Sequence, residues 1–291
     1  YLKMEGIDNQ FIDIRKYLKT DQNYRNANID LELSGQLCRE AFDFNTAPVF
    51  VTQGFIAGTR TNQTTTLGRE GSDYTAALLA NLLNAEDVTI WKDVPGVMNA
   101  DPKEYDKAQV ISRMSYKEAI ELSHFGAKVI HPKTIKPIQN KQIPLYVRSF
   151  LHPESTGTVI QEIDEHLKLP PIYINKGNQC LLTLTPRDFS FIAEEKLSHI
   201  FAILAQYKLK LNLMQNSAIS FSFCIDCNSA VFNTFLEQLQ EEFEVRYNQN
   251  VKLITSRHYD GEIIRGIIGD SPTRVEQRSR TTAQFVLRNH I

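Results

Sequence analysis

The sequence predicts an α/β fold in two parts: a parallel-rich sheet covered by helices, followed by ferredoxin-like βαββαβ modules. In the first half, short apolar runs typical of buried strands alternate with longer stretches of helical periodicity, as in a parallel sheet covered on both faces. In the second half, the expected order becomes strand, helix, two strands, helix and strand, and part of it then repeats. The 291 residues are enough for about two domains.

In the first part, strands and helices are expected to alternate regularly. The run at 48–52 is continuously apolar, as in a strand buried on both faces. Apolar residues cover most faces of the helix expected at 74–83, so that helix should be packed on more than one side. The expected elements are, in order, a helix end at 2–6, a strand at 11–14, a helix at 30–42, a strand at 48–52, a helix at 74–83, a strand at 87–91, helices at 115–125 and 132–142, and a strand at 144–148.

Proline, glycine and polar residues concentrate at 152–161 and 169–171, which is typical of a domain boundary. The predicted parts are a first domain at 1–160, a linker at 161–178, a βαββαβ module at 179–249 and a second, shorter module at 250–291. The elements expected after the linker are strands at 180–185, 210–216, 219–226 and 244–247 with helices at 194–207 and 231–243, then strands at 251–256, 274–278 and 283–287 with a helix at 261–268. The shorter module lacks a last helix and strand. Residues 172–175 are one candidate for completing it, which the pattern leaves open.

Composition argues against several classes of function. The net charge is −2 and no clustered basic surface is indicated, so no nucleic-acid partner is expected. No apolar run approaches the roughly 20 residues that span a bilayer, so no membrane segment is expected. Four cysteines are too few for a disulfide scaffold, which makes the reducing cytoplasm the expected compartment. Cys224 and Cys227 form a lone CxxC beside an expected strand, and neither a metal site nor a redox role is expected there.

The stretch at 64–73 predicts a site for an anion. It places three threonines, two glycines and Arg69 directly before the helix expected at 74–83. A helix N-terminus presents unpaired N–H groups and a partial positive charge, and Arg69 can bind a carboxylate or phosphate with two hydrogen bonds. Ser72 or Asp73 is expected to cap the helix. A well-capped helix without a ligand would give the same pattern, and the residues alone leave both interpretations open.

This stretch resembles the TTTLGRGGSD motif of aspartokinases, which belong to the amino-acid kinase family. Four further blocks match in the same order: 52–56 resemble the TQGFI strand end, 90–97 the IWTDVPG segment, 101–103 the DPR turn and 125–132 the FGAKVLHP segment. The resemblance identifies residues 1–160 as the C-terminal part of a kinase catalytic domain. The modules that follow resemble paired ACT domains, which bind amino acids as feedback regulators.

The resemblance implies a reaction. It is the ATP-dependent phosphorylation of the aspartate side-chain carboxylate to 4-phospho-aspartate, the first step of lysine, threonine and methionine biosynthesis, with ATP used together with Mg²⁺. No G-x-x-x-x-G-K-[ST] loop occurs in the chain, so a P-loop nucleotide site is excluded.

The resemblance also implies roles for residues around the expected helix start. Asp73 matches the acidic residue that organises catalysis at the phosphoryl group. The residues that match substrate-binding positions are Phe55, which would line the aspartate pocket, Arg69, which would bind a carboxylate, and Ser72, a small polar contact beside it. Each has a structural alternative: a first-turn charge for the aspartate, core packing for the phenylalanine, a surface ion pair for the arginine and a helix cap for the serine.

The nucleotide is expected to contact a second set of residues in the matching blocks. These are Lys92, Asp93, Met98, Lys103 and Lys128. The Pro-Gly pair at 95–96 predicts a turn that exposes its backbone. Lys128 would act as a point charge on the ATP phosphates, the alternative being an ordinary surface lysine.

The chain departs from the family pattern at matched positions and by one missing block. Glu70 replaces a glycine beside the anion site, Lys92 replaces a threonine, and Met98 replaces an aromatic residue. These changes are expected to shift nucleotide affinity without abolishing the site. The KFGGTS-type strand and loop with which aspartokinases begin does not occur. We therefore expect the chain to be N-terminally truncated relative to the family and to have no aspartokinase activity by itself.

The ACT-like modules predict an effector site and a dimer. The candidate effector-binding residues are Asn212, Gln215, Asn216 and Ser217. Lysine is the expected effector and threonine the alternative. Loss of regulation is also open, because an uncharged Asn212 stands where relatives place an acidic residue for the lysine amine. Ordinary strand and turn polarity would give the same residues. Exposed edges of such modules favour a homodimer through this half of the chain.

Two other functions compete with this interpretation. Another amino-acid kinase, such as a glutamate or acetylglutamate kinase, is disfavoured by the C-terminal repeat and by the blocks at 90–97 and 125–132. A non-catalytic regulatory subunit, made of part of a kinase lobe and ACT domains, would bind an effector and dimerise.

Overall fold

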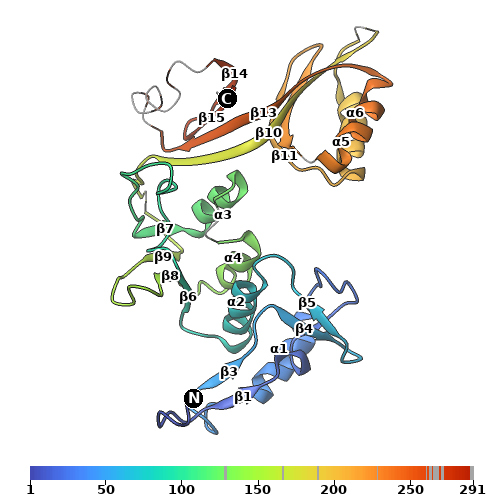
Figure 1. Cartoon of the computed structure of the whole chain (residues 1–291). Coiled ribbons are helices and arrows are strands. Elements are labelled where there is room, and N and C mark those ends of the chain that lie inside the picture. Colours follow the sequence, from blue (N-terminus) through green and yellow to red (C-terminus); the bar gives the residue numbers. More distant parts are fainter. Residues whose placement is uncertain are drawn as a thin grey trace. The chain divides into compact units, whose positions relative to one another are not determined.

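The computed structural model describes residues 1–127, 130–165, 167–188, 190–227, 229–259, 261, 264, 269 and 272–288. The chain forms two compact units (Figure 1). The first is Tyr1–Met98 with Ala108–Leu169, and the second is Asn99–Lys107 with Pro170–Ile291. Both units combine strands with helices, which confirms the predicted α/β class. Within the described ranges, no helix has both the length and the apolar character needed to cross a membrane.

The first unit contains three small sheets. Its strands are β1 (Gln10–Ile12), β2 (Lys19–Thr20), β3 (Phe50–Thr52), β4 (Ile56–Thr59), β5 (Thr64–Thr66), β6 (Val88–Lys92), β7 (Arg113–Ser115), β8 (Leu145–Ser149) and β9 (Thr158–Gln161). Parallel pairs join β1 to β3, β2 to β4, β6 to β8 and β7 to β9, whereas β4–β5 and β8–β9 are antiparallel. The strands predicted near 11–14, 48–52, 87–91 and 144–148 are all present.

The helices of the first unit are η1 (Ile14–Lys16), α1 (Leu31–Ala41), α2 (Gly71–Leu83), α3 (Tyr116–Phe125) and α4 (Pro132–Gln139). Most of them begin directly after a residue whose side chain caps them, and α2 is the exception. Asp30 accepts a hydrogen bond from the backbone N–H of Leu33 at 3.2 Å, and Ser115 accepts one from Glu118 at 3.1 Å. The helix end predicted at 2–6 is wrong. Those residues form turns.

The second unit centres on one six-stranded sheet in the order β11–β12–β10–β13–β15–β14. Its elements are β10 (Ile172–Pro186), α5 (Glu194–Gln206), β11 (Leu211–Asn216), β12 (Phe221–Asp226), α6 (Ser229–Gln240), β13 (Phe243–Arg257), β14 (Thr273–Arg278) and β15 (Thr282–Arg288). The run from β10 to β13 has the predicted βαββαβ order. Figure 1 shows β10 and β13 as long strands that run side by side.

These two long strands serve both predicted modules. β13 pairs with β10 near Val245 and Leu184, and again near Arg257 and Ile172. The first half of β10 therefore supplies the strand that the shorter module lacked. As a consequence, the predicted linker at 161–178 is too long, since its last seven residues are strand, and β13 crosses the predicted boundary between residues 249 and 250. The helix predicted at 261–268 lies mostly outside the described residues.

The segment Asn99–Lys107 belongs to the second unit. The predicted first domain at 1–160 is therefore interrupted by this segment. The backbone carbonyl of Asn99 accepts a hydrogen bond from the N–H of Tyr173 at 2.7 Å. The rings of Tyr105 and Tyr173 lie with their centroids 6.0 Å apart.

Helices α5 and α6 cover one face of the sheet. Ile200 and Ile203 of α5 pack there with Phe235 of α6 and Phe223 of β12. The opposite face carries a separate apolar cluster that includes Leu181 and Val286.

A disulfide joins Cys180 to Cys227, which the cysteine count did not lead us to expect. Both residues belong to the helix-covered face, whereas Cys224 lies in the apolar cluster of the opposite face. Cys224 of β12 and Cys227, which directly follows that strand, thus lie on opposite faces. Cys224 stays a buried thiol, and burial raises its pKa to about 12.

Candidate active site

Two strand ends and one helix start meet within the first unit. β1 and β3 are parallel and in register from Gln10 and Phe50 onward, so Asp13 and Gln53 follow their carboxyl ends at matching positions. The loop after β3 reaches the start of α2 at Gly71. Ligands of open parallel sheets bind beyond the carboxyl ends of the strands, and helix N-termini favour anions. This junction is therefore the candidate site.

Close packing at the junction requires glycine. A Cβ atom on Gly71 would lie 2.7 Å from Cδ2 of Phe55, and a Cβ atom on Gly54 would lie 3.1 Å from Cα of Ser72. The first distance leaves no room for a side chain unless the ring moves. Without these glycines the loop after β3 and the first turn of α2 could not touch as they do.

Phe55 has an unusual backbone conformation. Its φ of 74° lies in the left-handed region, which is rare for a bulky side chain. Its N–H donates to Oγ1 of Thr75 at 3.0 Å, which helps to hold this conformation. The side chain is 41% exposed, so the alternative of ordinary core packing does not apply. Strained residues of this kind cluster at ligand sites.

The start of α2 differs from the prediction. Glu70 is the N-cap residue, with φ of 53°, and its side chain makes no cap hydrogen bond. The prediction that Ser72 or Asp73 caps α2 is wrong, because the helix begins at Gly71 and both residues lie inside its first turn. The N–H of Gly71 donates to the carbonyl of Gly68 at 3.1 Å, but no side chain caps the next N–H groups of the first turn, at which an anion could bind.

Asp73 and Lys92 form an ion pair beside this helix start. Nζ of Lys92, the last residue of β6, donates to Oδ2 of Asp73 at 2.7 Å, and the two side chains are 25% and 15% exposed. The pair joins the predicted catalytic residue to one of the predicted nucleotide-binding residues, although 19 positions separate them. Asp73 is therefore more than a first-turn charge, since it fixes a cation at the end of a strand.

Arg69 and Ser72 are exposed at the same junction. Within the part of the chain that the structure describes, Arg69 makes no hydrogen bond or ion pair, so the alternative of a surface ion pair is not observed there. Its guanidinium group is free to bind an anion. Asp93, which follows Lys92, is also exposed.

The remaining predicted nucleotide-binding residues lie elsewhere. Met98 is half-buried and forms an isolated bridge with Val110. Lys103 is an exposed residue of the second unit, where its N–H donates to Oδ1 of Asp101 at 2.9 Å. Lys128 lies outside the described residues.

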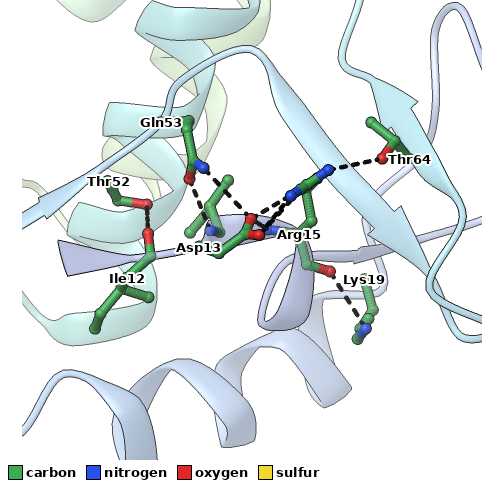
Figure 2. Close-up of polar contacts among 8 residues, drawn as sticks. Ile12, Asp13, Arg15, Lys19, Thr52, Gln53 and Thr64 are labelled. Carbon is green, nitrogen blue, oxygen red and sulfur yellow. Dashed lines mark hydrogen bonds and ion pairs between the residues drawn. The ribbon is translucent and has the colours of Figure 1, made fainter.

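Sequence reasoning missed a polar group at the ends of the strands. Figure 2 shows Asp13, Arg15, Gln53 and Thr64 linked by hydrogen bonds. Hydrogen bonding to the Arg15 guanidinium holds the pKa of Asp13 at about 2, well below its usual value. The available signal was a polar residue directly after an apolar strand run, which occurs at Asp13 and again at Gln53.

Among the predicted effector residues, Asn212 occupies a polar cluster on the sheet. Its Oδ1 accepts from Nζ of Lys176 at 2.7 Å. Its Nδ2 donates to Oε1 of Gln179 at 2.7 Å and to Oδ1 of Asp226 at 3.0 Å. Asn212 is therefore not a solvent-facing strand residue, and its amide is already engaged by the chain itself.

The other three effector candidates are exposed. Gln215 and Asn216 end β11. Ser217 closes the turn to β12, where its Oγ accepts from the N–H of Ser220 at 3.1 Å. The turn role predicted as the alternative is thus present at Ser217.

Comparison with known proteins places this site in a family. Residues 1–149 match the model of the amino acid kinase family, which is more than half of the chain. The chain belongs to the amino acid kinase family. It is 35% identical over 230 residues to lysine-sensitive aspartokinase 3 of Escherichia coli, a match that covers 77% of this chain and 50% of that protein. It is 32% identical over 253 residues to an aspartokinase of Chlamydia pneumoniae, covering 86% and 57%.

A solved aspartokinase structure is also similar to this chain. Escherichia coli aspartokinase III in complex with aspartate and ADP matches with a TM-score of 0.81 and 29% identity, covering 99% of this chain and 68% of that one. The resemblance to aspartokinases is therefore confirmed. The chain spans about half the length of the curated relatives named above.

Proposed function

We propose that the chain is part of an ATP-dependent aspartate kinase. This enzyme phosphorylates the aspartate side-chain carboxylate to 4-phospho-aspartate. The ion pair between Asp73 and Lys92 carries this proposal, because it sets a fixed cation beside an uncapped helix start. The exposed Arg69 adds a second, free cation at the same junction. Two anionic reactants, a carboxylate and a triphosphate, need such an arrangement.

In the reaction, a side-chain carboxylate oxygen of aspartate forms a bond to the γ-phosphorus of ATP, and the bond from that phosphorus to the bridging oxygen of ADP breaks. Arg69 binds a carboxylate of aspartate, with Ser72 beside it and Phe55 lining the pocket. Asp73 holds the Lys92 ammonium in position against phosphoryl charge. Most of the rate enhancement then comes from positioning and electrostatics.

The nucleotide enters as its Mg²⁺ complex, a substrate of the reaction. Its proposed contacts within the first unit are Lys92, Asp93 and Met98, whereas Lys103 and Lys128 stay predictions from the matching blocks. The Lys92 ammonium group supplies charge, and the turn at 95–96 supplies backbone groups.

Regulation belongs to the same proposal. The second unit binds an amino-acid effector, lysine or alternatively threonine, through Asn212, Gln215, Asn216 and Ser217, and so controls the first step of lysine, threonine and methionine biosynthesis. In support, Escherichia coli aspartokinase III has been crystallised with lysine and aspartate, and that structure matches this chain with a TM-score of 0.79 and 29% identity. Two copies pair through the exposed sheet edges at β11 and β14.

Calorimetric titration tests the proposal. L-aspartate and Mg·ATP are titrated separately into the 291-residue chain and into its Arg69→Met variant. We expect the unsubstituted chain to bind both ligands and the variant to lose aspartate binding while it keeps ATP binding. Arg60→Met is the matched control, because Arg60 is an exposed arginine of the same unit that pairs with Asp30. Absence of heat with aspartate, or equal losses in both variants, would refute the proposal.

A further inference from the structure

Asp13 and Arg15 form a two-pronged ion pair just past the end of β1 (Figure 2). Nε of Arg15 donates to Oδ1 of Asp13 at 2.9 Å, and Nη2 donates to Oδ2 at 2.6 Å. Asp13 also caps η1 by accepting the backbone N–H of Arg15 at 3.2 Å. A bidentate contact of this kind fixes the orientation of both groups as well as their distance.

Gln53 attaches this ion pair to the end of β3. Its Oε1 accepts the backbone N–H of Ile14 at 3.0 Å, and its Nε2 donates to Oδ1 of Asp13 at 3.4 Å. One residue earlier, Oγ1 of Thr52 donates to the carbonyl of Ile12 at 2.8 Å. Because Gln53 stands two residues before Phe55, the strained loop of the candidate site begins at a point held by Asp13.

Thr64 attaches the same ion pair to β5. Nη1 of Arg15 donates to its Oγ1 at 3.3 Å. From Thr64 the chain runs through β5 to Leu67, whose N–H donates to the carbonyl of Phe55 at 2.9 Å, and then to Arg69. The loops that carry Phe55 and Arg69 are therefore both connected to Arg15, one through Gln53 and the other through Thr64.

The Arg15 backbone is itself firmly held. Its carbonyl accepts a hydrogen bond from Nζ of the buried Lys19 at 3.3 Å. Gly58 of β4 packs so closely against that carbonyl that no side chain would fit there. The guanidinium thus extends from a fixed backbone to two separate strand ends.

The charges indicate a structural use of Arg15 rather than direct contact with a ligand. Both prongs of its guanidinium face the Asp13 carboxylate, which neutralises it. Arg69 has no such partner among the described residues and is the arginine with charge to offer an anion.

We propose that Asp13 and Arg15 are positioning residues for the carboxylate pocket: they join the ends of β1, β3 and β5 into one bracket that holds the Phe55 and Arg69 loops at their working separation. The identity of the ligand, aspartate, rests on the function proposed above. The bracket itself rests on the contacts of the chain.

Arg15→Lys is the informative variant, because it keeps the charge but loses the bidentate contact and the reach to Thr64. Arg60→Lys is the matched control. Arg60 pairs with Asp30, a helix-capping aspartate, at the same distance of 2.6 Å, but it contacts neither Gln53 nor Thr64. Calorimetry on the 291-residue chain should give an aspartate Kd about 10-fold higher for Arg15→Lys, with the Mg·ATP Kd unchanged within about 2-fold. Arg60→Lys should leave both unchanged.

A double variant tests whether the two residues act as one unit. Asp13→Asn combined with Arg15→Lys should raise the aspartate Kd no further than Arg15→Lys alone, because the pair is already broken. Additive losses would contradict a shared bracket. A loss of both ligands together with a fall in Tm would indicate general destabilisation and overturn the positioning role.

Amide hydrogen exchange gives a measurement that needs no ligand. In Arg15→Lys, the amides of Phe55 and Leu67 should exchange faster, while those of α1 keep their protection. If the unsubstituted chain binds no aspartate, the proposed function fails and the exchange result alone decides the bracket. Unchanged exchange at both amides would overturn the inference.

Discussion

The ion pair between Asp73 and Lys92 allows a quantitative test of the candidate site. Lys92→Met keeps an unbranched apolar side chain that reaches as far as Cε and removes the ammonium. At an effective dielectric of about 20, the 2.7 Å contact corresponds to about 6 kcal/mol of direct attraction, most of which is offset by desolvation of the two charges. Hydrogen bonds to charged groups contribute about 1.5–3 kcal/mol net. We therefore expect Lys92→Met to lower the free energy of unfolding by about 2 kcal/mol.

The chain supplies its own probe for this measurement. Its single tryptophan, Trp91, precedes Lys92 in β6 and is half-exposed, so its fluorescence during urea unfolding reports on the first unit. Lys92→Met leaves Asp73 as an unpaired, mostly buried carboxylate. The double variant with Asp73→Asn should consequently be more stable than Lys92→Met alone. A Lys92→Met variant within about 0.5 kcal/mol of the unsubstituted chain would refute the reasoning.

Other contacts give three further expectations. Arg15 lowers the pKa of Asp13 from 3.8 to about 2, so the stability that this carboxylate contributes is complete above about pH 4 and lost as the pH falls towards 2. In Asp13→Asn, the loss of stability between about pH 4 and pH 2 should be smaller than in the unsubstituted chain. Identical acid unfolding curves would argue against this contribution of Asp13. Gly71→Ala should lower the free energy of unfolding by about 1–3 kcal/mol, because its Cβ would meet the ring of Phe55. Gly177→Ala, with open space around it, should lower the free energy of unfolding by less than about 0.5 kcal/mol. Equal losses for the two variants in urea unfolding would contradict the packing argument. Thiol titration in guanidinium should find two free thiols before reduction and four after it, since one disulfide joins two of the four cysteines; four thiols before reduction would exclude the disulfide.

The long elements could be predicted from the sequence because their periodicity and caps are local. Asp30 and Ser115 stand directly before α1 and α3, and both helices begin within one residue of the predicted start. Strands of two to four residues, such as β2, β4 and β9, are too short to show a period.

The two ends of β10 were foreseen, as the strand expected at 180–185 and the candidate at 172–175, but its continuity through residues 176–179 was missed for a different physical reason. Gly177 and Asn178 read locally as a turn, and Asn178 indeed has φ of 52°. The strand nevertheless continues through an irregularity in its pairing with β13 between Lys176 and Gln179. The pairing partner, which lies more than 70 positions further along the chain, decides the outcome there, and local sequence carries no record of it.

In the candidate site, too, some features could be predicted from local sequence and others could not. The residues that stand in a motif, such as Phe55 and Arg69, could be proposed from order and spacing. The pairings that hold the site could not, because Lys92 finds Asp73 only once β6 and α2 are packed. The short η1 turn has the same effect at Asp13 and Arg15, because Asp13 caps this turn by accepting the backbone N–H of Arg15, a contact that the extended strand expected at 11–14 would not make.

Three cations of the first unit thus divide by whether the chain already neutralises them. Lys92 and Arg15 each have an aspartate partner, whereas Arg69 has none among the described residues. A paired cation stabilises the fold as well as the site, whereas an exposed unpaired one contributes little to the fold and is available to a ligand. Arg69→Met should therefore lower aspartate affinity without lowering the free energy of unfolding in urea, whereas Lys92→Met should lower the free energy of unfolding as well as ligand affinity. If Arg69→Met destabilised the first unit as much as Lys92→Met does, its charge would have to be engaged within the fold, and it could not be the group that receives the substrate carboxylate.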